Sequence, residues 1–133
     1  GKDTVVETVT GYLNDTDSFL RVEAVRALAI LGGIGAEIGV LLNDADPAVR
    51  LCAAEAIAGT GQDNAVAPLV EFAFTYEGYH GRATARLLRD LDADRASDLF
   101  RAALDDAAKK RVWSVAIEAL EELHCRPNSR QLV

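Results

Sequence analysis

A 20-residue segment of this chain occurs twice, the second copy starting 29 residues after the first. Residues 13–32 read LNDTDSFLRVEAVRALAILG, and residues 42–61 read LNDADPAVRLCAAEAIAGTG. The opening Leu-Asn-Asp, a second Asp, one Arg, three Ala and the closing Gly are identical between the copies. A repeat of about 30 residues with helical spacing indicates stacked helical hairpins, because one hairpin alone cannot bury its apolar face. This feature constrains the fold strongly and leaves the function open.

Each copy predicts one inner helix with an apolar stripe at steps of three and four residues. The stripe residues are Leu20, Ala24, Ala27, Leu28 and Leu31 in the first copy, and Val49, Ala53, Ile57 and Thr60 in the second. We expect Asp17 or Ser18 to cap the start of the first helix, and Asp46, followed by Pro47, to cap the second. Glycines at 32 and 33, and at 59 or 61, are expected to end the two helices.

The remaining sequence predicts outer helices and two further hairpins. The expected outer helices are the amphipathic segments 4–13, 34–42, 64–74 and 94–107. The second is short, because Gly35 and Gly39 disfavour a helix. The spacing between aligned apolar residues then grows to 31 and 32 residues. We therefore expect one domain over residues 1–124, with units at about 1–32, 33–61, 62–92 and 93–124, followed by a C-terminal tail at 125–133.

The conserved features of the repeat are an Asp before the inner helix, the run Asp46-Pro47-x-Val49-Arg50, the pair Ala53-Ala54 and the closing glycine. This pattern resembles the short HEAT-like repeat that also occurs in the phycobilisome lyase group. The resemblance rests on the motif over residues 13–61 and on the period alone over residues 62–123. It implies an all-α fold, a right-handed α-solenoid of about four stacked helical hairpins of the HEAT/armadillo type.

Composition argues against several classes of function. The chain of 133 residues has a net charge of −7, so it repels phosphate groups, which argues against binding nucleic acid or an anionic membrane. Cys52 and Cys125 have no neighbour at metal-ligand or redox spacing, so we expect free thiols in a reducing compartment. We find no apolar run of membrane-spanning length and no signal peptide. We expect a cytoplasmic, prokaryotic protein whose sequence, lacking Met, begins after its natural start.

Charged residues recur at fixed positions of the repeat. Asp17 with Arg21, and Asp46 with Arg50, occupy the same two places in adjacent units, and in HEAT-like arrays such pairs usually bridge neighbouring repeats. A second set alternates in sign from unit to unit: Arg26, Glu55, Arg86 and Glu118. Such a ladder attracts along its length, although each exposed pair contributes only about 0–1 kcal/mol. We interpret both sets as structural, with a partner-binding ridge as the alternative.

Residues 72–82, FAFTYEGYHGR, depart most from the repeat, because the Asp-Pro-x-Val-Arg turn is missing there. Tyr76, Tyr79 and His80, beside two glycines, form a candidate binding rim, since a Tyr side chain offers a rigid apolar ring and a polar tip. The alternative is a longer turn whose aromatic side chains fill a wider gap between helices.

Trp113 stands at the repeat position that Arg50 holds in the second unit. It either caps the core of the last repeat or joins an aromatic and basic patch on an otherwise acidic protein. The predicted partner-binding residues are Tyr76, Tyr79, His80, Arg82, Arg86 and Trp113.

The predicted function is a non-enzymatic scaffold or interaction module that binds a protein or peptide on the concave face of the solenoid. His80 and His124 belong to no nucleophile, metal or phosphate-binding motif, so we expect no catalytic residue, metal or cofactor. The resemblance implies an alternative, a tetrapyrrole- or cofactor-handling lyase or chaperone subunit, which a deep apolar pocket near Tyr79 and Trp113 would favour. Nucleic-acid binding ranks last, because aspartates interleave with the C-terminal basic residues. The oligomeric state is left open.

Overall fold

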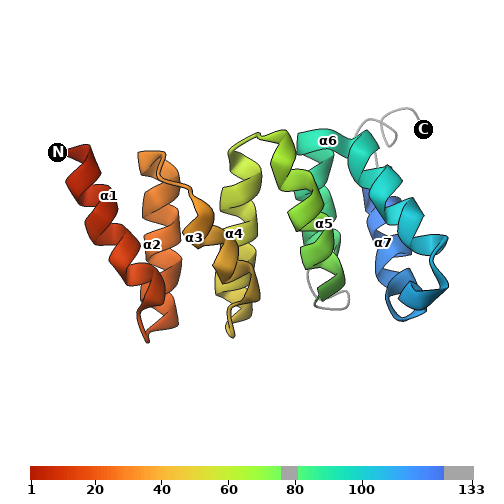
Figure 1. Cartoon of the computed structure of the whole chain (residues 1–133), viewed down its shortest axis with the longest axis horizontal. Helices are drawn as coiled ribbons and strands as arrows, with labels where there is room; N and C mark the ends of the chain where they lie inside the picture. The colour runs from red at the N-terminus through yellow and green to blue at the C-terminus, as the bar shows by residue number, and fades with distance from the viewer. Residues whose placement is uncertain (76–80, 125–133) are drawn as a thin grey trace, which may run out of the picture. The chain divides into compact units, whose positions relative to one another are not determined.

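Figure 1 shows the structure, a computed structural model that describes residues 1–75 and 81–124. Within these residues every regular element is a helix, so the predicted all-α class is confirmed. The chain forms two compact units, unit 1 at Gly1–Gly61 and unit 2 at Gln62–Val133.

Unit 1 contains two helical hairpins built on the same plan. The first consists of α1 (Lys2–Gly11), a 3-10 turn (Tyr12–Asn14) and α2 (Ser18–Leu31), and the second of α3 (Ala36–Val40), a 3-10 turn (Leu41–Asn43) and α4 (Pro47–Gly59). Within this unit α1 and α3 form one layer, α2 and α4 form the other (Figure 1), and α2 packs against α4. The predicted inner helices are therefore α2 and α4.

The ends of α2 and α4 follow the sequence prediction. Asp17 and Asp46 each accept a hydrogen bond from the backbone N–H two residues on, at 2.9 and 2.8 Å, as N-cap residues do. Gly32 ends α2 with a φ of 75°, and Gly61 turns the chain after α4 with a φ of 69°. Glycine reaches this left-handed region without steric cost, which explains why both copies of the repeat close on a glycine.

The core of unit 1 lies between its two layers. Leu28, Ile38 and Val49 are at most 1% exposed. The predicted stripe is wrong at Leu20, which is 38% exposed, and it omitted Val25, which is fully buried. Val25 is buried because α2 packs against α4 as well as against α1. Leu20 stays partly exposed because it lines an open hollow in the first hairpin.

Unit 2 begins with a 3-10 turn (Asp63–Ala65) and continues through α5 (Val66–Thr75), α6 (Gly81–Leu104), a 3-10 helix (Ala107–Val112) and α7 (Trp113–Leu123). α6 packs against both α5 and α7. Asp92 interrupts α6 with a non-helical φ of −163° and ψ of 88°, and the part after it is the predicted fourth outer helix, which ends at residue 104 and not at 107. Phe100 is fully buried and packs edge-on against Phe74, with ring centroids 5.5 Å apart.

Candidate partner-binding surfaces

Three of the six predicted partner-binding residues fall within the described structure. Arg82 and Arg86 lie in the first two turns of α6, and Trp113 is the first residue of α7. Tyr76, Tyr79 and His80 lie outside the described residues.

The two arginines face the C-terminal end of α7. The Nη2 atom of Arg82 lies 3.9 Å from Oε1 of Glu121, and Nε of Arg86 donates a hydrogen bond to Oε1 of Glu122. The Arg82 and Arg86 side chains are 47% and 59% exposed, so their guanidinium groups remain largely in solvent. An exposed ion pair such as that of Arg82 and Glu121 contributes about 0–1 kcal/mol. The Arg82 guanidinium can therefore exchange its present carboxylate for that of a partner at little cost, whereas the Glu122 side chain that Arg86 contacts is only 14% exposed.

Trp113 lies at the opposite end of α7. Its Nε1–H donates a hydrogen bond of 2.8 Å to the carbonyl oxygen of Ala103, in the last turn of α6, and Nζ of Lys110 lies 6.0 Å from the centroid of its ring. About 12 Å of helix separates Trp113 from Glu121. The indole and the arginine pairs thus occupy opposite ends of α7. The carbonyl oxygen of Ala103 also accepts the backbone N–H of Asp106, at 3.2 Å, so the indole adds a second donor at the end of α6.

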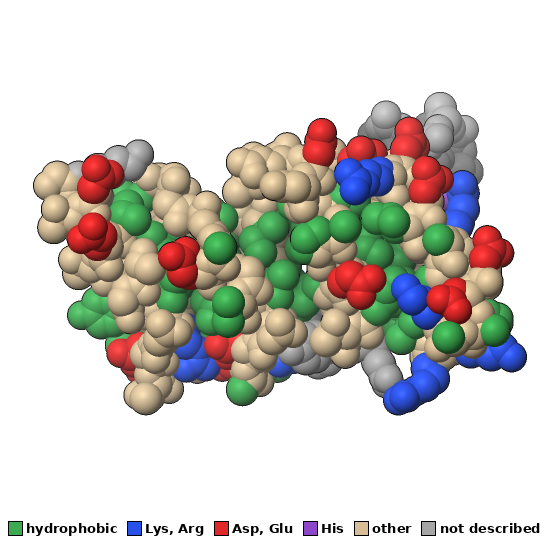
Figure 2. Space-filling view, viewed as in Figure 1, with side chains coloured by type: hydrophobic (Ala, Val, Ile, Leu, Met, Phe, Trp, Pro, Cys, Tyr) green, Lys and Arg blue, Asp and Glu red, His purple; other side chains and the backbone are tan. Residues whose placement is uncertain are grey.

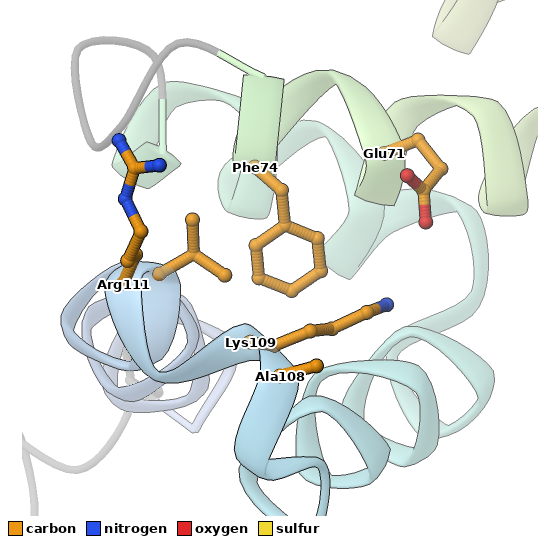
Figure 3. A pocket seen from close by; sticks show the side chains of 6 residues that line it. Glu71, Phe74, Ala108, Lys109 and Arg111 are labelled. Atoms are coloured by element: carbon orange, nitrogen blue, oxygen red, sulfur yellow. The ribbon is translucent and has the colours of Figure 1, made fainter.

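An open hollow of about 300 Å³ lies in unit 2, between the end of α5 and the 3-10 helix that precedes α7. In Figure 3 the Lys109 side chain runs beneath the Phe74 ring toward Glu71, and its Nζ lies 5.5 Å from the ring centroid, a cation–π distance. The lining residues are Glu71, Phe74, Ala108, Lys109, Arg111 and Val112. Sequence reasoning missed this hollow. Residues 72–74 (Phe-Ala-Phe) and 109–111 (Lys-Lys-Arg) supply part of its lining. Helical periodicity does not predict that these two distant segments lie next to each other.

In unit 1 the repeated arginine bridges the two hairpins. Nε and Nη2 of Arg21 each donate a hydrogen bond of 2.9 Å to the carboxylate of Asp44, and Nη1 donates one of 2.8 Å to the carbonyl oxygen of Asp15. Arg50 repeats the last contact at the carbonyl oxygen of Asp44, also at 2.8 Å. The predicted bridging role is confirmed for Arg21, although its partner is Asp44. The two acids that were predicted as partners cap the helices instead.

The bridge shifts the pKa of both partners. The hydrogen bond to Asp44 raises the pKa of the Arg21 guanidinium. Burial by itself would raise the pKa of Asp44, but hydrogen bonds from Arg21 and from the backbone N–H of Asp46 stabilise the carboxylate and lower the pKa on balance. The Arg21 and Asp44 side chains are only 15% and 8% exposed, so water screens this pair less than the exposed pair of Arg82 and Glu121 in unit 2.

The expected ladder of alternating charges does not pair along its own length. Nη1 of Arg26 lies 3.0 Å from Oε1 of Glu23, one turn earlier on the same helix. Arg86 pairs with Glu122, one turn beyond the predicted Glu118. For Arg26 the prediction was wrong because Glu23 lies only three residues away on the same helix. For Arg86 the partner does lie on the next helix of unit 2, but four residues after the predicted position.

Other kinds of site were sought over residues 1–75 and 81–124. There, no group of three or more His, Cys, Asp and Glu side chains is arranged to hold a metal ion. No helix in those ranges combines the length and the hydropathy needed to cross a bilayer. Cys52 is a free, partly buried thiol whose pKa is raised by burial, and Cys125 lies outside the described residues.

A family model described as HEAT repeats matches residues 36–121, from the start of α3 through most of α7. The match includes most of the region in which the sequence keeps only the period of the repeat. No curated protein and no solved structure matches the chain. The HEAT-like resemblance is therefore confirmed, whereas the phycobilisome-lyase type is not.

Proposed function

Because this chain belongs to the HEAT repeat family, we propose that it is a non-enzymatic module that binds a protein or peptide. HEAT repeat proteins are generally interaction scaffolds and generally lack catalytic activity. The observation that carries the proposal is the hollow of unit 2, since its lining combines an aromatic ring with charges of both signs. This mixture suits a polypeptide better than a phosphate or an apolar cofactor.

The hollow offers three kinds of contact. Phe74 presents an aromatic ring, Lys109 an ammonium group and Glu71 a carboxylate (Figure 3). Phe74 is held from behind by the fully buried Phe100, so its ring is fixed before a partner arrives. A rigid aromatic anchor with a polar rim is the usual composition of a binding hot spot. A segment with an apolar side chain for the ring and an acidic one for Lys109 would match this lining.

The predicted residues enter the proposal as a second contact zone in unit 2. Arg82 and Arg86 supply exposed guanidinium groups, which bind carboxylates through paired hydrogen bonds. Figure 2 shows acidic and basic side chains interleaved on the viewed face of unit 2. That arrangement favours a protein partner over nucleic acid, which needs a continuous basic surface. The other predicted residues, Tyr76, Tyr79, His80 and Trp113, stay candidate contacts outside this pair of arginines.

The tetrapyrrole-handling alternative stays a hypothesis. It requires a deep apolar pocket, whereas the hollow at Phe74 is open and is lined by the charged side chains of Glu71, Lys109 and Arg111. A large apolar cofactor would desolvate these groups without pairing them, at a cost in binding free energy.

Affinity capture with the full chain tests the proposal. Immobilised wild type and Lys109→Glu are exposed to extract of the source organism, retained proteins are identified by mass spectrometry, and each is then titrated as a purified protein by calorimetry. We expect at least one partner whose affinity falls about tenfold or more for Lys109→Glu, because an attractive charge contact becomes repulsive.

The matched control is Arg101→Glu, which makes the same change of charge at an exposed residue of α6 outside the hollow lining. It should retain wild-type affinity. The double variant Arg82→Glu/Arg86→Glu measures the second contact zone separately. A purified partner that binds all variants with equal affinity contradicts the proposed surface, and the recovery of no partner by wild type contradicts the proposed function.

A further inference from the structure

Two large apolar side chains stay in solvent on the same side of α2. Phe19 is 66% exposed and Ile30 is 86% exposed. They are eleven residues apart, which is three helical turns, so they lie on one side of α2, about 17 Å apart along its axis. Arg26 lies between them on that side, with a side chain 65% exposed. A single exposed apolar residue is ordinary, whereas two on one side of a helix beside a hollow mark an interaction surface.

The internal repeat shows that this side of the inner helices is not a stacking side. A shift of 29 residues converts the three residues of α2, Phe19, Arg26 and Ile30, into three residues of α4, Ala48, Glu55 and Gly59. All three residues of α4 are exposed, although α2 packs against α4. These six residues are called the open face of unit 1 below. The same face stays open in a hairpin that has a neighbouring inner helix, so its exposure in α2 does not depend on what precedes α1.

A hollow of about 270 Å³ lies between α2 and α4 and includes part of the open face. Its lining residues are Val25, Arg26, Ala29, Cys52, Glu55 and Ala56. On the open face, α4 carries small residues, Ala48 and Gly59, at the repeat positions of the two large residues of α2. Small side chains on α4 let a partner approach closely, and the large ones on α2 provide apolar anchors.

The chemistry of the hollow favours a helical partner over an extended one. An extended segment brings backbone N–H and C=O groups that need hydrogen-bond partners when they are buried. None of the six described residues that line the hollow has an amide or hydroxyl side chain, and the backbone of α2 and α4 is paired within the helices. A helix satisfies its own backbone and presents only side chains to such a groove.

The charges at the hollow favour a basic partner. Nη1 of Arg26 lies 3.0 Å from Oε1 of Glu23 on its own helix, so these two charges balance each other. Glu55 is exposed and forms no ion pair with any residue of 1–75 or 81–124. One carboxylate at the hollow is therefore unmatched within the described structure. The net charge of −7 of the whole chain acts in the same direction and attracts a basic segment.

We propose that the open face of unit 1 docks an amphipathic α-helix of a partner protein. The apolar stripe of that helix contacts Phe19 and Ile30 and covers the hollow between α2 and α4. A lysine or arginine beside the middle of the stripe pairs with Glu55. The inference rests on the proposed binding function and adds a surface in unit 1 together with the chemistry of its partner.

The probe is a designed peptide with leucines spaced four, three and four residues apart, one lysine beside this stripe in the middle turn, and alanine and glutamine elsewhere. A side-chain staple holds it helical, because a free helix of this length is marginal in water. Fluorescence anisotropy of a fluorescein label gives its affinity for the full chain. We expect saturable binding that Ile30→Lys weakens about tenfold or more, because an apolar anchor becomes a charge that repels the peptide lysine.

Val40→Lys is the matched control. Val40 is 70% exposed and, like Ile30, lies in the last turn of its helix. Its helix, α3, belongs to the other layer of unit 1 (Figure 1), so this variant should bind the peptide as wild type does. A lysine suits the C-terminal end of a helix dipole at both positions, so both variants keep the fold, as circular dichroism will check.

Charge reversal tests the contact at Glu55. Glu55→Lys should weaken binding about tenfold, and a peptide with glutamate in place of its lysine should recover that loss. Glu7→Lys makes the same change at an exposed residue of α1 and measures the general attraction between an acidic chain and a basic peptide. The recovery should be larger for Glu55→Lys than for Glu7→Lys, because only the first pair is in contact.

Alkylation of Cys52 locates the peptide without changing the open face. Cys52 is a free thiol that lines the hollow. Its reaction with N-ethylmaleimide is followed by mass spectrometry in a Cys125→Ser chain, in which Cys52 is the only cysteine. Saturating peptide should slow the reaction about tenfold, because a bound helix excludes solvent from the hollow.

Each other outcome overturns the inference. Absence of saturable binding to wild type removes the docking face. Equal weakening by Ile30→Lys and Val40→Lys, or an unchanged alkylation rate, places the peptide elsewhere, and equal recovery for Glu55→Lys and Glu7→Lys removes the charge contact. Dimerisation of the chain in ultracentrifugation, abolished by Ile30→Lys, would make the occupant a second copy. Lys109→Glu should bind this peptide as wild type does, so failure of the proposed function at unit 2 and failure at the open face are measured separately.

Discussion

Units 1 and 2 both join neighbouring helices by acid–base pairs, but they place these pairs in different surroundings. In unit 1 the pair of Arg21 and Asp44 joins α2 to the turn before α4, with side chains 15% and 8% exposed. In unit 2 the pair of Arg82 and Glu121 lies on the open surfaces of α6 and α7, with side chains 47% and 64% exposed. The first arrangement fixes the stacking of two hairpins, whereas the second contributes little to stability and stays available to a partner.

The helix boundaries of the two units differ in the same way. In unit 1 an aspartate caps each inner helix and a glycine follows it, so short local signals set the ends. In unit 2 the long helix α6 is interrupted at Asp92, and the Trp113 indole bonds the carbonyl of Ala103 near its end. Aspartates also cap helical segments in unit 2, since Asp92 accepts the backbone N–H of Arg95 and Asp106 accepts that of Ala108. What distinguishes unit 2 is therefore the added hydrogen bond from the Trp113 indole to the end of α6.

The largest effects are expected from the cores. Phe100→Ala in unit 2 should lower the free energy of unfolding by about 3–5 kcal/mol, and Leu28→Ala in unit 1 by about 2–5 kcal/mol, because each leaves a cavity at a fully buried site. Urea unfolding is followed by circular dichroism and by the fluorescence of Trp113, the only tryptophan, which reports on unit 2. If the two units unfold separately, Leu28→Ala destabilises unit 1 alone. It then shifts the urea unfolding curve followed by circular dichroism more than the curve followed by Trp113 fluorescence, which reports on unit 2.

Ile30→Ala is the control for this experiment. Its side chain is 86% exposed, so the free energy of unfolding should change by less than about 0.5 kcal/mol. Identical shifts of both signals for Leu28→Ala and for Phe100→Ala would mean one cooperative transition, and the comparison of two units would then fail as a statement about stability.

Most of unit 1 could be predicted from the sequence because its signals are local. The cap of Asp46 on α4 involves residues two positions apart, and Gly32 acts on its own helix. Asp44 was missed as the partner of Arg21 although it is identical between the two copies. A difference of two residues along the chain, from Asp46 to Asp44, separates the acid that caps α4 from the acid that bridges to Arg21, and periodicity does not resolve that difference.

The binding surface of unit 2 could be predicted only in part, because it depends on contacts distant in the sequence. The exposure of Arg82 and Arg86 follows from helical position. The cation–π contact between Lys109 and Phe74 depends on how α6 and the 3-10 helix fold back toward α5. A local sequence pattern does not predict that arrangement. Trp113 was weighed as a cap or a contact, and only the structure shows its bond to Ala103.

Acid should weaken the bridge of unit 1. The pKa of Asp44 is lowered in the folded state by the hydrogen bonds that outweigh its burial, and that of Asp46 by the bond from the backbone N–H of Ala48. Both lie below the unfolded value of about 3.9, so this stability is present above pH 4 and is lost as pH falls through the folded pKa values. Dichroism-monitored unfolding at pH 7 and pH 3 should show the loss.

Asp44→Asn sharpens this pH test. The amide keeps an acceptor for the N–H of Asp46 but no charge for Arg21, so the variant should be less stable than wild type at pH 7 and should lose less between pH 7 and pH 3. Glu121→Gln is the counterpart in unit 2 and should leave the pH dependence near that of wild type. If the free energy of unfolding of Asp44→Asn falls between pH 7 and pH 3 by as much as that of wild type, carboxylates other than Asp44 cause the fall.

Trp113→Phe should have a moderate effect. Phenylalanine keeps most of the ring contact but cannot donate to the carbonyl of Ala103, and loss of one such hydrogen bond costs about 1 kcal/mol. Urea unfolding monitored by circular dichroism measures the change, since the variant has no tryptophan. A neutral result would mean that water replaces the donor, and Trp113 would then count as a surface residue and not as a cap.

The smallest effect is expected at Arg82. Arg82→Gln removes an exposed pair whose atoms are 3.9 Å apart, so the free energy of unfolding should change by less than about 0.5 kcal/mol. The same substitution should weaken binding of any partner that uses the second contact zone, because it removes the guanidinium group that such a partner would engage. The two measurements, urea unfolding and calorimetric titration, separate a stacking role from a binding role. A loss of stability comparable to that of Trp113→Phe would assign Arg82 to the stacking of α6 on α7 and make the two units alike.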